Sequence, residues 1–434
     1  MRILYTPAGD TDPIRNYHDG GILHILRHYN PEKIFVFLSA EMKMKEEQRQ
    51  IYTKAIKYVA PSCELNFIKT DIIDVHRMEN LFPLIDEYLN IRKKYPNDEI
   101  LLNLSSGTPQ MKTIMSFIAT DFDNVRAVQV DSPAGKSNRS AFATQDNEDI
   151  DVLLELNEDN EKDSPNRCSE PPLNVLQWYS LKHQLISLVN SFEYRSAYKI
   201  YAKHKNLFAE IVGDLLQHCI LREDMRTKKA FEIIKKVNGI SLDKECNAKV
   251  KQINEFLMIM ELRQKKGQIS EFLVKITPFL YELTLFHLQN NLGIKAEQFC
   301  DKGSSYGQWN INKEKLKSCL PQATAALEMK YGIFRDRTDL SFTNILEILN
   351  VIENSQQEKE INRLLNDLRT AERKYRNVAA HVISEVNDDL VSSAELMLKI
   401  RKVFFLIMEK EDIFRKNIYY VLNEIIVKEL NEKH

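Results

Sequence analysis

The first 156 residues alternate short apolar runs with segments of helical periodicity. Three of the runs, IFVFL, ILLNL and VRAVQV, are largely apolar, as expected for strands of a sheet whose two faces are both covered. Because helix-length segments separate the strands, we predict right-handed crossovers and a mostly parallel sheet. The expected strands are Arg2–Tyr5, Lys33–Leu38, Glu64–Ile68, Glu99–Leu104, Val125–Val130 and Asp151–Leu156, and the expected helices lie at 20–30, 42–60, 77–95 and 109–120.

The pattern predicts a Rossmann-like α/β domain over residues 1–156. The last expected strand follows the loop 131–150, which contains no clear helical pattern, so it fits an antiparallel edge strand. The next segment, NEDNEKDSPNRCSEPP at 157–172, is polar and ends in two prolines, which is typical of a linker or an exposed excursion.

The chain from residue 173 onward has the pattern of an all-α bundle. Only Pro278 and Pro321 interrupt it, and apolar residues recur at helical spacing, as at Ile345, Ile348 and Leu349. Such spacing is typical of amphipathic helices that pack against one another. The RQKKGQIS segment is one plausible break, so we expect an intermediate helical domain over 173–265 and a second helical domain over 266–434.

Composition changes this picture little. The chain has 434 residues, 43% hydrophobic and 28% charged, and a formal net charge of −2, so any nucleic-acid site must be a local basic patch. Its six cysteines form no C-x-x-C pair and read as thiols in a reducing compartment. No apolar run approaches the about 18 residues of a membrane span, and the N-terminus lacks the pattern of a signal peptide. We expect a cytoplasmic protein.

Polar and small residues follow the expected strands. In an open parallel sheet, ligands bind beyond the carboxyl ends of the strands. The first strand leads into Thr6, Pro7, Ala8, Gly9 and Asp10, the second ends at Ser39, and the fifth ends at Asp131. We therefore expect these residues to contribute to a ligand site.

The loop after the fourth strand is the strongest candidate. Gly107 permits close approach of a ligand to the backbone, and Pro109 suits the first turn of a helix, whose free N–H groups favour anions. Such a loop fits a phosphate or nucleotide cradle, and it equally fits an ordinary helix connection with a capping hydroxyl. The side chains that would face the ligand are Ser105, Ser106, Gly107, Thr108, Gln110 and Lys112.

Standard nucleotide and metal patterns are missing. The sequence has neither G-x-G-x-x-G after its first strand nor G-x-x-x-x-G-K-[ST], which disfavours an ordinary dinucleotide fold and a P-loop NTPase. His24 and His28 have the i, i+4 spacing that a metal can use, but no third ligand is evident nearby. We expect structural or surface histidines there and no metal.

The string RNVAAH, residues 376–381, carries a second candidate site. Metal-free RNA cleavage needs a group that transfers protons and a cation that stabilises the phosphorane. His381 titrates in a suitable range, and Arg376 has a planar fork that matches a phosphate. Asn377 could orient either group. An arbitrary R-x4-H string is more often part of a solvated helix surface, so the context must decide.

Helix geometry adds a constraint on this pair. Five residues of an ideal helix correspond to roughly 140° of net rotation, so Arg376 and His381 do not point the same way. Either the helix begins or bends between them, or a second copy of the chain completes the site. A homodimer is therefore a natural hypothesis.

Together the two halves resemble a known family. An α/β half with NLSSGTPQMK (Asn103–Lys112), followed by a helical half with RNVAAH, looks like the CARF–HEPN ribonucleases of type III CRISPR systems, specifically the Csm-type ancillary effector. The resemblance covers the whole chain in domain order.

The resemblance implies a function for each half. The CARF half would dimerise and bind a cyclic oligoadenylate activator, with Ser105, Ser106, Gly107, Thr108, Gln110 and Lys112 matching the ligand loop and Thr6–Asp10 matching by position. The HEPN half would cleave single-stranded RNA, with Arg376 and His381 matching the catalytic motif, Asn377 its common polar position, and no cofactor required. Some family members also cleave their activator slowly. One alternative is a nucleotide-sensing transcriptional regulator, which should contain a helix-turn-helix; we find none. Another is a small-molecule enzyme of the Rossmann type with a helical dimerisation domain, which would leave RNVAAH unexplained.

Overall fold

The computed structural model describes residues 1–121, 124–133, 149–234, 244, 246–303, 309–332, 338–352, 354–381 and 393–432, with only the backbone at 121 and 374–381. The described residues pack as two compact units, Met1–Leu181 and Lys182–His434. Among them, no helix combines the length and apolarity needed to cross a membrane.

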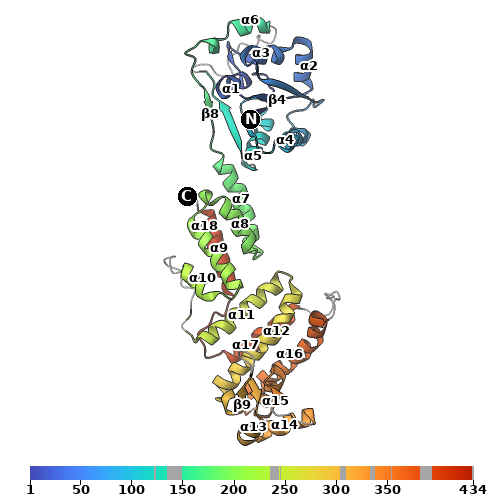
Figure 1. Ribbon diagram of the computed structural model, residues 1–434, viewed down its shortest axis with the longest axis vertical. Coiled ribbons are helices and arrows are strands. Elements are labelled where there is room, and N and C mark those ends of the chain that lie inside the picture. The colour runs from blue at the N-terminus through green and yellow to red at the C-terminus, as the bar shows by residue number, and fades with distance from the viewer. Residues whose placement is uncertain are drawn as a thin grey trace. The chain divides into compact units, whose positions relative to one another are not determined.

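The first unit is a sheet with helices on both faces (Figure 1). Its strand order is β5-β4-β1-β6-β7-β8, parallel throughout except for the antiparallel pair β7–β8. The main strands are β1 (Arg2–Pro7), β4 (Lys33–Leu38), β5 (Glu64–Lys69), β6 (Glu99–Asn103), β7 (Val125–Val130) and β8 (Cys168–Ser169); β2 (Ile14–Arg15) and β3 (His18–Asp19) form a separate hairpin.

Alternate residues of β1 build the two cores of this unit. Leu4 packs with the apolar side chains of the helices on one face, whereas Ile3 and Tyr5 pack with those on the other, as the period of a strand requires. The first face is covered by α1 (Gly21–Tyr29), α2 (Ala40–Arg49), α3 (Ile51–Val59) and α6 (Ile150–Glu155), and the second by α4 (Phe82–Lys94) and α5 (Pro109–Asp121).

The predicted Rossmann-like sheet is confirmed, but the last expected strand is wrong. Residues 151–155 belong to helix α6 instead, and Leu156 follows its end. Ile150, Leu153 and Leu154 are buried at helical spacing, and the Asp149 side chain accepts a hydrogen bond from the Asp151 amide (3.1 Å) as an N-cap. The antiparallel edge strand is β8, which lies in the segment expected as a linker.

One expected helix is also divided. The segment 42–60 forms α2 and α3, because Gln50 adopts a left-handed conformation with φ of 53° and ends the first helix. Such a residue breaks the i to i−4 ladder and redirects the chain.

The second unit is helical, as predicted, apart from one small three-stranded sheet. Its apolar core joins α11, α12, α15, α16 and α17 and includes residues on both sides of position 265/266. The domain boundary expected at that position stays a prediction. Its elements are the second part of α7 (Asn174–Asn190), then α8 (Tyr194–Lys203), α9 (Glu210–Glu223), α10 (Thr227–Ile234), α11 (Ala248–Lys265), α12 (Ile269–Phe286), β9 (Cys300–Lys302), β10 (Trp309–Ile311), α13 (Lys313–Cys319), α14 (Pro321–Tyr331), β11 (Thr338–Asp339), α15 (Phe342–Ile352), α16 (Gln356–His381), α17 (Ser393–Ile407) and α18 (Ile418–Asn431).

A buried ion pair ties three helices of this unit together. The Arg222 guanidinium in α9 donates to both carboxylate oxygens of Glu255 in α11, with Nε at 3.0 and 3.1 Å. The Tyr419 hydroxyl from α18 donates to the same carboxylate (3.2 Å). All three residues are buried, so each satisfies polar atoms that water cannot reach.

Two buried histidines make the second unit sensitive to pH. Burial lowers the pKa of His218 to about 4, and burial likewise lowers the pKa of His287 to about 4. As pH falls below 6.5, the unfolded chain binds these protons before the folded chain does, so stability is lost between pH 6.5 and 4. Each histidine should cost about 2 kcal/mol of unfolding free energy between pH 7 and pH 5.

We therefore expect His287→Gln to remove about 2 kcal/mol from the pH dependence of unfolding between pH 7 and pH 5. Glutamine can still accept the hydrogen bond that Asn291 Nδ2 donates to His287 Nδ1 (3.0 Å). Urea titrations at both pH values measure the effect, and His183→Gln, at an exposed helix position, is the control. The same pH dependence in wild type and His287→Gln would contradict the prediction.

Candidate functional site

The loops that follow β1 and β6 touch each other through their backbones. A Cβ atom added to Gly9 would lie 2.6 Å from the amide nitrogen of Gly107. Gly107 itself has a φ of +82°, a conformation that L side chains rarely adopt. Glycine is therefore required on both sides of this contact, which brings the first and fourth predicted loops together.

A buried amide organises these two loops. Asn103 Nδ2 donates to Thr6 Oγ1 (3.0 Å) and to Ser106 Oγ (2.7 Å), and its Oδ1 accepts from the Ser105 amide (2.8 Å). Asn103, Thr6 and Ser106 are completely buried. The sequence analysis did not single out Asn103, although a polar residue that ends an apolar strand was a usable signal.

A small cavity of about 60 Å³ opens beside this contact. Ser105 and Asp131 are the two predicted ligand residues that line it. Ser105 Oγ accepts a hydrogen bond from the Val130 amide (2.6 Å), which fixes the fourth loop to the end of β7. The full lining consists of Thr11, Arg15, Asn16, His18, Asp19, Gly20, Gly21, Ser105, Val130, Asp131, Ser132, Pro133 and Arg167.

Other predicted ligand residues have structural contacts at the loop ends. Thr108 Oγ1 donates to the Val75 carbonyl (3.1 Å) and caps α5 through the Met111 amide (3.4 Å). Ser39 Oγ caps α2 in the same way. Asp10 is exposed and lies 3.4 Å from Lys45 Nζ. None of these three side chains lines the cavity.

The remaining predicted residues surround the loop contact. Pro7 lies against Gly107, and the Ala8 amide donates to the Phe37 carbonyl (3.0 Å). Gln110 Oε1 is buried and has no hydrogen-bond partner among the described residues.

The buried Asp12 of the first loop interacts electrostatically with the half-buried Lys112 of α5. Burial raises the pKa of Asp12 to about 6, against the hydrogen bond from the Ile22 amide (3.1 Å), which lowers it. Burial lowers the pKa of Lys112, and the Asp12 charge opposes this effect. This arrangement places a carboxyl group that titrates near neutrality beside an ammonium group. Asp12 was not among the predicted site residues.

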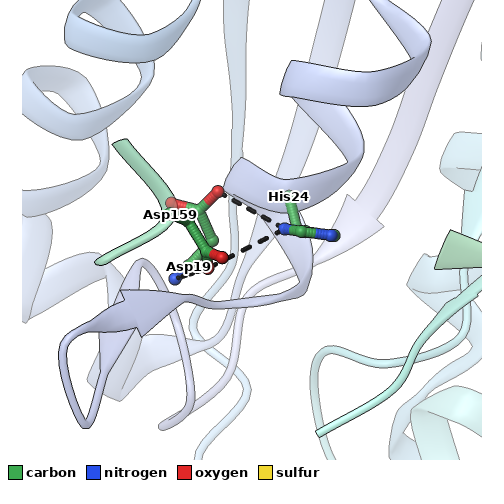
Figure 2. Close-up of side chains that lie close together, drawn as sticks. All are labelled: Asp19, His24 and Asp159. Carbon is green, nitrogen blue, oxygen red and sulfur yellow. Dashed lines mark hydrogen bonds and ion pairs between the residues drawn. The ribbon is translucent and has the colours of Figure 1, made fainter. Parts of the chain in front are cut away.

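Next to the cavity, the carboxylates of Asp19 and Asp159 approach the same ring nitrogen of His24 (Figure 2). Its Nδ1 is 3.5 Å from Asp19 Oδ2 and 3.9 Å from Asp159 Oδ2, and its Nε2 accepts from the Arg167 amide (2.9 Å). The three side chains offer ligand atoms within 4.8 Å of one another, a spacing that a metal ion could use.

Two guanidinium groups already neutralise these carboxylates. Arg27 Nε lies 2.7 Å from Asp19, and Arg167 Nη2 lies 2.5 Å from Asp159. The cluster therefore fits a buried ion-pair network better than a metal site. Arg167 also connects this network to the cavity, because its Nη1 donates to the carbonyl of Asp131, which lines the cavity (2.8 Å).

The RNVAAH string stands at the end of a long helix. Helix α16 runs from Gln356 to His381, which excludes a helix start between Arg376 and His381. The side chains of Arg376, Asn377 and His381 lie outside the described residues. One turn earlier, Glu372 is buried, accepts a hydrogen bond from Thr277 Oγ1 (2.6 Å) and pairs with Arg369, so α16 is fixed to α12 just before the motif.

Family models match both units. The Cas_Csm6 CARF domain matches residues 64–168, the Csm6 6H domain matches 171–223, and the Cas_Csm6 HEPN domain matches 241–427. The HEPN match contains the RNVAAH string, and the CARF match contains the fourth loop.

Several proteins named CRISPR system endoribonuclease Csm6 or Csm6′ are similar to this chain. One from Streptococcus thermophilus is 26% identical over 91% of both chains, and a second is 32% identical over 59% of this chain and 68% of the relative. One from Enterococcus italicus is 31% identical over 50% of this chain, and the matched part covers about half of that relative's length, 54%.

A solved structure has the same fold. Enterococcus italicus Csm6 bound to cyclic hexa-2′-fluoro-hexa-dAMP superposes with a TM-score of 0.70 at 22% identity, covering 99% of this chain and 100% of that one. The family models and the relatives confirm the resemblance inferred from the sequence. The chain therefore belongs to the Csm6 family of type III CRISPR endoribonucleases, which join a CARF domain to a HEPN domain.

Proposed function

We propose that this chain forms a homodimer and cleaves single-stranded RNA when a cyclic oligoadenylate binds its CARF unit. The cleavage needs no metal or other cofactor. The observation that carries the proposal is that RNVAAH ends a continuous helix inside the residues matched by the HEPN model. That match favours a nuclease over a transcriptional regulator with the same kind of sensor.

The loops at the strand ends are the proposed activator site. They combine backbone amides, hydroxyl groups and the Lys112 ammonium, which are groups suited to phosphodiesters. The site would comprise Thr6, Pro7, Ala8, Gly9, Asp10, Ser39, Ser105, Ser106, Gly107, Thr108, Gln110, Lys112 and Asp131. Because the Enterococcus italicus neighbour is bound to a cyclic compound of six nucleotides, cyclic hexaadenylate is the first activator to test.

In the proposed reaction, an RNA phosphodiester is cleaved by the neighbouring 2′-hydroxyl group, without an external nucleophile. The ribose 2′-oxygen attacks the phosphorus as its proton leaves to a base, and the bond to the 5′-oxygen breaks as that oxygen receives a proton. His381 would transfer protons, Arg376 would stabilise the charged phosphorane, and Asn377 would orient them. The products are a 2′,3′-cyclic phosphate and a 5′-hydroxyl.

Replacement of the motif should remove catalysis but not activator binding. We expect His381→Ala to lower the rate by about 10² to 10⁴, the usual contribution of acid–base catalysis, and Arg376→Ala by about 10² to 10³, the usual contribution of one charge-stabilising group, while EDTA leaves wild-type activity intact. A fluorogenic RNA assay with saturating activator measures the rates. Arg363→Ala, at an exposed position of the same helix, is the matched control, and activity that EDTA abolishes would point to a metal nuclease instead.

Mixed dimers test whether the site is composite. A dimer of one Arg376→Ala chain and one His381→Ala chain retains one arginine and one histidine at a shared twofold site. Co-expressed and purified through two different tags, this heterodimer should be more active than either parent homodimer. If each protomer instead has a complete site of its own, the heterodimer will be as inactive as its parents.

The fourth loop should set the sensitivity to the activator. We expect Thr108→Ala or Lys112→Ala to raise the half-maximal activator concentration about tenfold or more, because each removes a polar contact to a phosphate. The maximal rate at saturation should change little. Thr113→Ala, exposed on the same helix, serves as the control, and an unchanged activation curve for both loop variants would remove this loop from the site.

A further inference from the structure

A second cavity lies within the helical unit, apart from both sites described above. It has a volume of about 350 Å³, within the usual range of small-molecule sites. Its walls come from α9, α10, α11 and the segment before α18. The lining consists of Arg222, Met225, Thr227, Lys228, Phe231, Lys244, Cys246, Ala248, Lys251, Gln252, Asn254, Glu255, Met258 and Phe414.

The charge of this cavity is positive. Arginine and lysine supply four of the described lining residues, whereas Glu255 is the one acid among them, and Glu255 is already bound to Arg222. Lys244 pairs with Asp412 (2.9 Å). Lys228 is exposed and forms no ion pair with another described residue, so it can bind a ligand anion without breaking a contact.

Aromatic and sulfur-containing side chains supply the apolar surface. Phe231 and Phe414 both line the cavity, together with Met225 and Met258. A cation accompanies each ring: the Arg222 guanidinium carbon lies 5.5 Å from the centre of the Phe231 ring, and Lys244 Nζ lies 5.5 Å from that of Phe414. Rings next to cations suit a flat aromatic group that carries a phosphate.

One lining side chain has an unmet hydrogen bond. Asn254 is 6% exposed, and its Oδ1 has no hydrogen-bond partner among the described residues. A buried acceptor without a donor costs free energy, which a ligand N–H group would recover. The cavity is thus complementary to a ligand that has a planar group with an N–H donor at one end and an anion at the other.

We propose that this cavity binds a nucleotide, either free or as one residue of an RNA strand. The base packs against the Phe231 and Phe414 side chains, a base N–H group donates to Asn254, and the phosphate pairs with Lys228. The inference does not rest on the proposed catalytic mechanism, because it concerns binding in a different part of the helical unit.

Calorimetric titration of the full chain tests this site. We would use the Arg376→Ala/His381→Ala double variant, which should leave RNA uncut, and titrate cytidine monophosphate, ribose 5-phosphate, inorganic phosphate and a short single-stranded RNA. Cytidine has an exocyclic amine but is not an adenylate, so it avoids the proposed activator site. We expect cytidine monophosphate to bind more tightly than ribose 5-phosphate.

Two neighbouring lysines of α10 locate the binding. Lys228→Glu should weaken nucleotide binding at least fivefold, whereas Lys229→Glu, which is equally exposed but outside the cavity, should not. Bound nucleotide should also slow the alkylation of Cys246, which lines the cavity, relative to the exposed Cys319. Asn254→Leu should reduce the advantage of cytidine monophosphate over ribose 5-phosphate.

The outcomes separate the possible ligands. If only the RNA binds and Lys228→Glu weakens it, the site takes a residue of a strand, which supports the proposal. Equal binding of phosphate, ribose 5-phosphate and cytidine monophosphate would reveal a simple anion site and overturn it. Absence of binding by every ligand, or equal effects of Lys228→Glu and Lys229→Glu, would also overturn it.

Discussion

The close approach of two backbones at the strand ends is the constraint on which the first unit depends. Gly9 and Gly107 leave no room for a side chain between them, and Asn103 binds two adjoining hydroxyl groups and one backbone amide through three hydrogen bonds. The parallel register of β1 and β6 brings both loops to the same edge. The sheet itself therefore brings together the two loops of the proposed activator site.

The second unit depends on a different kind of interaction. Apolar contacts between its helices are not directional, whereas the Arg222–Glu255 pair joins two buried charges through hydrogen bonds of defined geometry. Tyr419 adds the third helix to the same carboxylate. Buried ion pairs contribute little net stability, yet a mismatched one is very costly, so such a pair can select one packing. The hydrogen bond from Thr277 to Glu372 likewise links α12 to α16.

The sequence was sufficient for features that depend on local pattern. The five parallel strands follow from their apolar runs, and the helical second half follows from its periodicity. Periodicity failed at 151–156, where a short apolar run fits a strand and a helix equally well. The interactions of Asn103, Asp159 and Arg167 could not be read from the chain, because they join residues up to 148 positions apart. The proposed catalytic and ligand residues came from motif and resemblance, which identify residue types but not side-chain positions.

The pairing of β8 with β7, together with the Asp159 and Arg167 contacts at His24, has a consequence for biosynthesis. The N-terminal sheet receives its final strand, and the buried Asp19 amide and the His24 ring receive their hydrogen-bond partners Asp159 and Arg167, only from residues 159–169. A nascent chain must therefore release these residues from the ribosome before its first unit can close. A fragment that stops at Leu156 would lack both the edge strand and the Asp159 and Arg167 charges, and it should be prone to aggregation and degradation.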